Sequence, residues 1–98
     1  TCSGLRLHAV APHAVRPVAL GLALLADVAR LHPDAFAWAP YATAANPTGT
    51  DHLERLLGTG RVRPVIDAAP GRVDERVLAN WTAAPGWAAR HRAVARYD

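Results

Sequence analysis

The spacing of apolar residues changes near residue 17, from alternation to the spacing of a helix. Leu5 and Leu7 alternate with other residues between positions 4 and 11, which is typical of a strand with one buried face. From Pro17, which suits the first turn of a helix, two apolar stripes run side by side. Their members are Val18, Leu22, Leu25 and Ala29 in one stripe, and Leu20, Leu24, Val28 and Leu31 in the other. We predict a strand near residues 4–11 and a long buried helix over residues 17–31.

Turn residues divide the rest of the chain into short helices. Thr50 or Asp51 is placed to cap a helix that Gly58 ends, and Glu54 is placed to support the cap. The small residues at 42–50 predict a loop before this helix. Three further short helices are predicted over residues 61–69, 73–83 and 87–95.

The predicted strand requires a partner, because a buried strand cannot leave its backbone hydrogen-bonding groups unpaired. The candidate partner strands are residues 36–43 and the terminal stretch 94–97. The predicted fold class is therefore α+β, with a small sheet covered by the long helix and by several short helices.

The chain has 98 residues, of which 51% are apolar and 19% charged. These values indicate one small globular domain rather than a disordered segment. Because the sequence begins with Thr1 rather than Met, we expect it to be part of a longer protein. The longest apolar run covers residues 17–26, and a helix needs about 20 apolar residues to cross a bilayer. We therefore expect no membrane span.

The positive charge of the chain does not point to nucleic acid. The formal net charge is +3, and all 11 basic residues are arginine while 22 positions are alanine. This composition is also what a GC-rich coding bias produces. Acidic residues are interleaved with the arginines in the second half, whereas a nucleic-acid surface needs basic residues gathered on one face. We expect no nucleic-acid partner.

Candidate catalytic and metal-binding groups do not converge in the sequence. The five histidines lack the helical spacing of a zinc site, and a single cysteine excludes every multi-cysteine metal pattern. Several of the eight acids fall at predicted helix starts, where capping and the helix dipole account for them. We predict no catalytic residue, no metal site and no cofactor in this chain.

Five pieces of the sequence occur in the order in which one bacterial domain family carries them. They are residues 2–8 (CSGLRLH), 16–25 (RPVALGLALL), 32–38 (HPDAFAW), 53–59 (LERLLGT) and 77–81 (VLANW), followed by Tyr97. With them the chain resembles the C-terminal domain of the bacterial exo-acting β-N-acetylmuramidases. It departs from that family at Val73, where a Ser or Thr helix cap is usual, and at Pro85-Gly86, which interrupts the last helix.

The resemblance implies an accessory domain of a peptidoglycan-acting glycoside hydrolase that removes N-acetylmuramic acid from non-reducing ends. In that family a Rossmann-like N-terminal domain carries the catalytic carboxylate. Residues 1–98 are therefore expected to form a single C-terminal domain that is inactive alone and helps to shape the substrate cleft. The expected partners are the N-terminal catalytic domain of the same polypeptide and peptidoglycan fragments. The sequence leaves the cellular location open, and kinship favours a place outside the cytoplasmic membrane.

Polar residues at one rim of the predicted strand and on the loop near residues 42–50 are the candidate substrate contacts. An arginine can hold the carboxylate of a lactyl ether with two hydrogen bonds, and histidines and amides can bond to hydroxyl groups. The candidates are His8, His13, Arg16, Tyr41 and Asn46. Two alternatives stay open. In one, His8 and Arg16 only cover a sheet edge; in the other, the domain is a non-catalytic binding or protein-interaction module.

Overall fold

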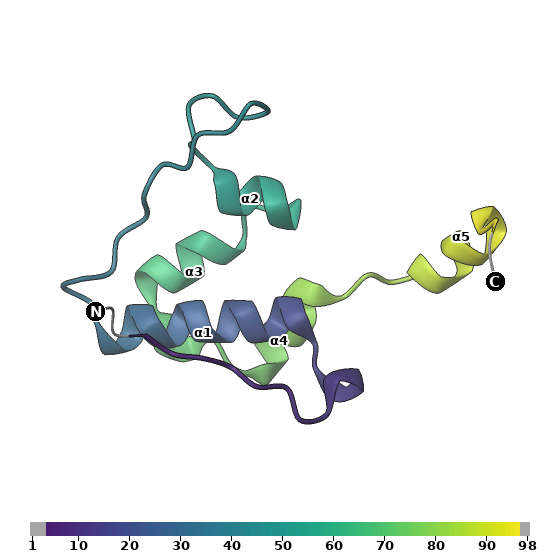
Figure 1. Cartoon of the computed structure of the whole chain (residues 1–98), viewed down its shortest axis with the longest axis horizontal. Coiled ribbons are helices and arrows are strands. Elements are labelled where there is room, and N and C mark those ends of the chain that lie inside the picture. The colour runs from purple at the N-terminus through teal and green to yellow at the C-terminus, as the bar shows by residue number, and fades with distance from the viewer. Residues whose placement is uncertain (1–3, 97–98) are drawn as a thin grey trace.

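The computed structural model describes residues 4–96, and this part of the chain is built from helices and loops (Figure 1). In chain order the elements are η1 (Pro12–Ala14), α1 (Pro17–Leu31), α2 (His52–Leu57), α3 (Val62–Ala68), η2 (Pro70–Arg72), α4 (Glu75–Thr82) and α5 (Trp87–Val94), where η marks a 3₁₀ helix. The long helix has the bounds that the sequence predicted, and the short helices lie where turn residues placed them.

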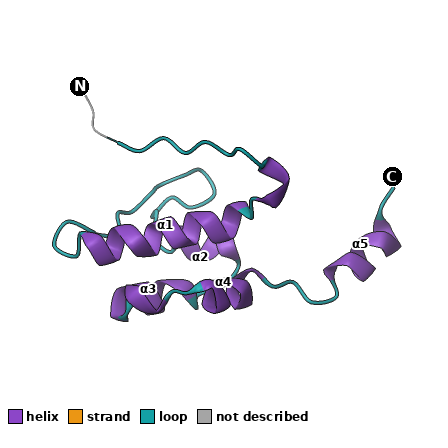
Figure 2. Cartoon of the chain, turned by 90° about the horizontal axis from the view of Figure 1, so that it is seen from below, coloured by secondary structure: helices purple, strands orange, loops and turns teal. Residues whose placement is uncertain are grey.

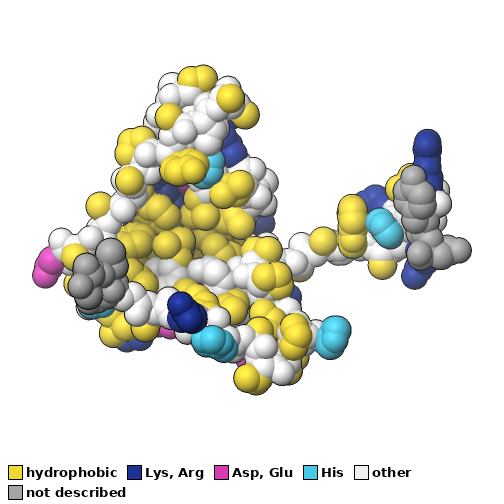
Figure 3. Space-filling model, in the orientation of Figure 1, with side chains coloured by type: hydrophobic (Ala, Val, Ile, Leu, Met, Phe, Trp, Pro, Cys, Tyr) yellow, Lys and Arg dark blue, Asp and Glu magenta, His cyan; other side chains and the backbone are white. Residues whose placement is uncertain are grey.

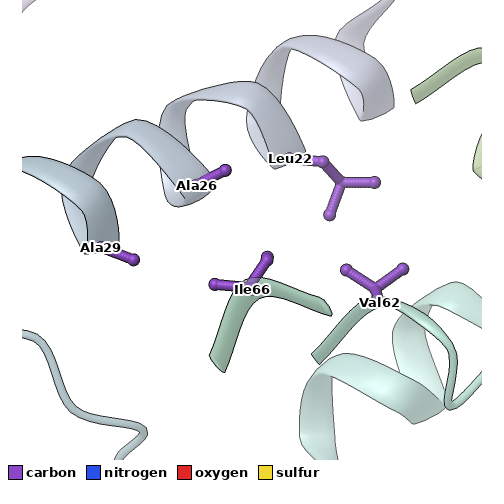
Figure 4. Close-up of a cluster of buried hydrophobic side chains, with 5 residues drawn as sticks. All are labelled: Leu22, Ala26, Ala29, Val62 and Ile66. Carbon is purple, nitrogen blue, oxygen red and sulfur yellow. The ribbon is translucent and has the colours of Figure 1, made fainter. Parts of the chain in front are cut away.

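The hydrophobic core lies where α3 packs against α1 (Figure 4). On α1 the buried side chains are Leu22, Ala26 and Ala29, and from α3 Val62 and Ile66 point back at them. Val62 and Ile66 are each 1% exposed. The two alanines are small enough to let the α3 backbone come close to α1. Burial of one Ile or Val side chain contributes about 1.5–3 kcal/mol, so this contact is the main stabilising element of the fold.

The predicted α+β fold is wrong for residues 4–96, since no strand and no sheet occurs among them. Residues 4–9 run as an extended loop with no ladder partner (Figure 2). The segment 36–43 contributes only an isolated bridge between Thr43 and Asn46. At the C-terminus Val94 ends α5, and Tyr97 lies outside the described residues. An alternating pattern marks a face that suits a sheet, but a strand forms only when a second strand pairs with its backbone.

The loss of the sheet also changes the burial of α1. We predicted a helix buried along both apolar stripes, but one face alone is covered by α3 and its neighbours. On the other face Leu20 is 41% exposed, Val28 45% and Leu31 60%. In the N-terminal segment Leu5 is 90% exposed. These apolar groups face solvent because the sheet that was expected to cover them is not there.

Helix caps explain where α4 begins. The side chain of Asp74 accepts a hydrogen bond of 2.8 Å from the backbone N–H of Val77, which is the usual N-cap contact. Val73 itself cannot cap a helix, but Asp74, the next residue, caps α4 in its place. The break at Pro85-Gly86 is real, because Gly86 takes a left-handed conformation with φ 73° and α5 starts after it.

The described chain is extended rather than spherical. Its radius of gyration is 16.2 Å, whereas a compact domain of this length has about 13 Å. Helix α5 stands away from the other helices at the end of a linker formed by residues 83–86 (Figure 1). Helices α1 to α4 and the loop before α2 pack around the core. Helix α5 contributes no residue to it.

Candidate functional site

A cavity of about 340 Å³ lies between the loop that precedes α2, α2 itself and α3. Its lining consists of Trp38, Ala39, Pro40, Gly49, Thr50, Asp51, His52, Leu53, Glu54 and Arg63. Residues 38–40 and 49–54 thus come together from the two ends of one loop, and α3 supplies the arginine. The cavity combines an aromatic ring, a guanidinium group, two carboxylates and a histidine.

The loop between the two walls is closed by Asn46. This side chain is 4% exposed, and its amide Nδ2 donates to the carbonyl oxygen of Thr50 at 2.7 Å. Two backbone hydrogen bonds of 3.0 and 3.1 Å join Thr43 and Asn46. The Tyr41 N–H donates to the Gly49 carbonyl at 3.0 Å. This closure brings residues 39–41 beside residues 49–51 and so forms the mouth of the cavity.

Trp38 forms an immobilised wall of the cavity. Its indole Nε1 donates a hydrogen bond to Asp67 Oδ1 of α3, and Phe36 meets its ring edge-on with the centroids 5.1 Å apart. The guanidinium carbon of Arg63 lies 5.2 Å from the ring centroid, within the range of a cation–π contact. The aromatic wall is therefore tied to α3 and carries a positive group.

The acidic residues of the cavity do not have the roles that the sequence suggested. Asp51 precedes α2 in a left-handed conformation with φ 53°, and its side chain makes no capping hydrogen bond. Glu54 does not support a cap either, since no hydrogen bond joins its side chain to the Asp51 N–H among the described residues, and its Oε2 atom is buried without a partner there. A buried polar group without a partner costs about 1–3 kcal/mol. Strained backbone and unsatisfied polar atoms are frequent at functional sites.

His52 connects the cavity to Tyr41. The two rings are in an edge-to-face arrangement with centroids 4.9 Å apart. Tyr41 is 64% exposed, and it does not itself line the cavity, although its neighbour Pro40 does. The site as a whole can bind a polar ring: it offers oxygen acceptors for hydroxyl donors and an aromatic wall for an apolar ring face.

The model of one protein family, described as exo-beta-N-acetylmuramidase NamZ, C-terminal, matches residues 1–95. The chain belongs to this family. No curated protein matches the chain, and no solved structure does. Membership of the NamZ C-terminal family confirms the resemblance carried by the five sequence pieces. The chain is thus an accessory domain of a muramidase-type glycoside hydrolase, and its position in such proteins implies a catalytic partner domain.

The NamZ C-terminal chain separates the five predicted substrate contacts into two groups (Figure 1). Tyr41 and Asn46 belong to the loop before α2, where Tyr41 is exposed and Asn46 holds the loop closed, and neither side chain lines the cavity. His8, His13 and Arg16 lie along the N-terminal segment up to the start of α1, and all three are exposed. The structure does not bring the second group to the cavity.

Arg16 lies instead at a shallow groove beside α1. The groove has a volume of about 310 Å³ and is lined mainly by apolar residues of η1, α1 and Leu78. The Arg16 guanidinium donates a hydrogen bond of 2.9 Å to the Thr82 hydroxyl of α4. This bond links α4 to the start of α1, and the other guanidinium donors of Arg16 remain open to solvent.

Sequence reasoning missed four residues of the cavity. Asp51 and Glu54 were assigned to helix capping, although Glu54 belongs to the LERLLGT piece that carries the resemblance. Trp38 was noted only as the last residue of the HPDAFAW piece, and Arg63 was not singled out. No spacing rule joins residue 38 to residue 63, because their contact depends on how the loop folds back onto α3.

Within residues 4–96 no group of three or more His, Cys, Asp or Glu side chains is placed to hold a metal ion. None of the described helices combines the length and the apolar character that crossing a membrane requires.

Proposed function

We propose that this chain packs on the catalytic domain of an exo-acting β-N-acetylmuramidase and forms one wall of its substrate cleft. The observation that carries this proposal is the size of the exposed surface. The accessible surface is 8281 Å², whereas a compact monomer of this mass exposes about 5,400 Å². An excess of this size is typical of a domain that is completed by a partner.

Much of the exposed surface is apolar. The exposed large apolar residues are Leu5, Leu7, Val10, Val18, Leu20, Val28, Leu31, Tyr41, Leu56, Trp87 and Val94. Figure 3 shows apolar side chains gathered in a broad hollow between α1 and α2. Solvent-exposed apolar area of this extent marks an interaction surface. The catalytic domain of the same polypeptide is the partner that family membership implies.

The substrate class follows from the family and fits the cavity. Peptidoglycan fragments are glycans, and their rings present hydroxyl donors together with apolar C–H faces. The cavity offers matching groups, which are the carboxylate of Asp51, the ring of Trp38 and the guanidinium of Arg63. The bond-breaking groups belong to the catalytic domain in this proposal. The removal of N-acetylmuramic acid from non-reducing ends is therefore a property of the whole protein.

The N-terminal contacts extend the same proposal. Arg16 uses one guanidinium nitrogen for Thr82 and keeps others free to hold a carboxylate such as that of the lactyl ether. His8 and His13 lie on the same exposed N-terminal segment and are proposed to bond to substrate hydroxyl groups once the catalytic domain is docked beside them.

The test is hydrolysis by the full-length protein that contains this domain. We expect it to release N-acetylmuramic acid from the ends of peptidoglycan fragments and from a chromogenic N-acetylmuramide. Folded full-length protein that releases none would contradict the proposal. Binding of muropeptide without hydrolysis would instead support a non-catalytic binding module.

A further inference from the structure

We infer that helix α5 docks into an apolar groove, bordered by carboxylates, on the catalytic domain of the same polypeptide. The docking face consists of Trp87, Arg90, His91 and Val94. This inference rests on the proposed packing of the two domains and deepens it. It assigns one element of this chain to the contact between them and states the chemistry of the surface that receives this element.

Helix α5 does not pack on the rest of the described chain. Every residue from 83 to 96 is exposed, and none of them belongs to the hydrophobic core or packs against it. The helix has 8 residues, whereas an isolated helix needs about 12–15 residues even for marginal stability in water. Most of the stability of a helix in a protein comes from the packing of one face. The contact that stabilises α5 is therefore expected from outside residues 4–96.

The side chains of α5 have the spacing of a helix that lies in a groove. Trp87, Arg90, His91 and Val94 occupy positions i, i+3, i+4 and i+7, which share one face of a helix. Trp87 is 59% exposed and Val94 73%, so the apolar side chains at both ends of this face are uncovered. Helices that bind in grooves bury such apolar anchors in the partner. The receiving surface is therefore an apolar groove.

The charge of α5 and its flanking residues favours an acidic border around that groove. Residues 83–96 contain three arginines and one histidine but no acid, whereas residues 1–82 contain eight arginines and seven acids. Among residues 4–96 neither Arg90 nor Arg92 forms an ion pair. Figure 3 shows basic and apolar side chains close together on this detached part of the chain. Carboxylates beside the groove would pair with the guanidinium groups and fix the orientation of the helix.

The start of α5 is ordered without a partner. The Trp87 N–H donates to the Ala84 carbonyl oxygen at 3.0 Å. Arg90 Nη1 donates to the Pro85 carbonyl oxygen at 3.2 Å, and the rings of Trp87 and His91 lie with their centroids 5.4 Å apart. These contacts hold the first half of the docking face in place, which lowers the entropy cost of binding.

Other occupants fit this face less well. The apolar groove beside α1 contains Arg16, which would repel the arginines of α5 from a second copy of the chain. A membrane-binding helix needs a broad apolar face, and α5 has only two large apolar side chains, Trp87 and Val94. An anionic polymer would pair with the arginines but would leave Val94 uncovered. A protein groove with acidic borders accounts for both the charge and the anchors.

The experiment compares Trp87→Asp with Ala89→Asp in the full-length protein by hydrogen exchange of the α5 backbone. Both substitutions place an acid in the first turn of α5, where it suits the helix dipole, but only Trp87 lies on the docking face. In the unaltered protein we expect the α5 amides to exchange about 100-fold or more slowly than in an unstructured chain. Trp87→Asp should lose most of this protection, and Ala89→Asp should keep it within about threefold.

Exchange of α5 at the unstructured rate in the unaltered protein would overturn the inference, and so would equal protection in the two variants. Salt screens ion pairs, so protection should fall several-fold between about 0.05 and 0.5 M salt. Protection that does not depend on salt would overturn the acidic border. Protection that appears only after addition of polyphosphate or of phosphatidylglycerol vesicles would assign α5 to an anionic polymer or a membrane, which also overturns the inference.

A photo-cross-link identifies the surface that covers α5. The variant is His91→p-benzoylphenylalanine, which places the reactive group between the two apolar anchors. Irradiation of the full-length protein should join position 91 to peptides of the catalytic domain within one chain. Cross-links to residues 4–82 would place α5 on its own domain, and cross-links between two chains would show a dimer. Either result overturns the inference.

None of these measurements requires hydrolysis, so the inference and the proposed function can fail separately. Full-length protein that releases N-acetylmuramic acid while α5 is unprotected supports the proposed function and overturns the inference. A protected α5 that cross-links to the other domain, in a protein that releases no N-acetylmuramic acid, supports the docking of α5 and contradicts the proposed activity.

Discussion

At position 49 the loop before α2 needs a residue without a side chain. Gly49 has φ 69°, a left-handed conformation that other residues rarely adopt. A Cβ atom at this position would lie 2.6 Å from the backbone nitrogen atoms of Tyr41 and Ala42. The mouth of the cavity can therefore close only because position 49 is glycine. Gly21 is the opposite case, since it lies in the middle of α1, where a Cβ atom would meet nothing within 4 Å.

We expect Gly49→Ala to destabilise the protein by about 1–3 kcal/mol through backbone strain and steric overlap. Gly21→Ala should instead stabilise it by about 0.5–1 kcal/mol, because alanine restricts the unfolded chain and favours a helix. Urea unfolding followed by circular dichroism measures both changes. A Gly49→Ala variant as stable as Gly21→Ala would disprove this account of the loop.

At the scale of the elements, proline and turn residues predicted the positions of the helices correctly. The alternation of apolar residues predicted a strand and a sheet, and this prediction was wrong. Pro17 opens α1 and His32-Pro33 follows its end, so its bounds were predictable from adjacent residues alone. The sheet was not predictable in this way, because a strand over 4–11 depends on a partner distant in sequence. The same limit applies to the candidate site. Asp51 and Glu54 lie in one short segment and could be singled out from it, whereas Arg63 required the packing of α3.

Two aspartates that precede helices should respond in opposite ways to substitution. Asp74→Ala removes the cap of α4 and should cost about 0.5–2 kcal/mol. Asp51→Gly removes no capping bond and relieves a left-handed conformation, so it should not destabilise the chain and should stabilise it by up to about 1 kcal/mol. Chemical unfolding of both variants provides the comparison. Equal losses of stability would mean that Asp51 stabilises α2 in a way that its observed contacts do not explain.

At the scale of the whole molecule, the chain has a small core and a large apolar exterior. Five apolar residues form the buried cluster, and eleven large apolar residues are exposed. The outer face of α1 is the largest helical part of this exterior. An accessory domain with so small a core and so much exposed apolar surface depends on its neighbour for stability. We therefore expect the two domains to unfold together rather than independently.

Substitution on the outer face of α1 tests this arrangement. Leu20→Asp places a charge on the outer face of α1, which is the proposed domain interface, and an acid near the N-terminal end of the helix is compatible with the helix itself. We expect activity of the full-length protein to fall about tenfold or more, with the circular dichroism of its helices retained. Arg76→Asp is the control, because it also places an acid in the first turn of a helix, at an exposed position of α4 that is not part of the apolar surface. It should stay within about twofold, and equal losses in both variants would argue against α1 as the docking face.

The family, the bounds of α1 and the positions of the turns all followed from the order of the amino acids, because each of these depends on residues that are neighbours along the chain. Folding in three dimensions decided which side chains share a cavity, since Trp38, Glu54 and Arg63 meet only after the loop has closed onto α2 and α3. It also decided that the alternating N-terminal segment stays unpaired in residues 4–96. A side-chain pattern can specify the face that a segment would bury, but the hydrogen bonds that make a strand have to come from another part of the molecule.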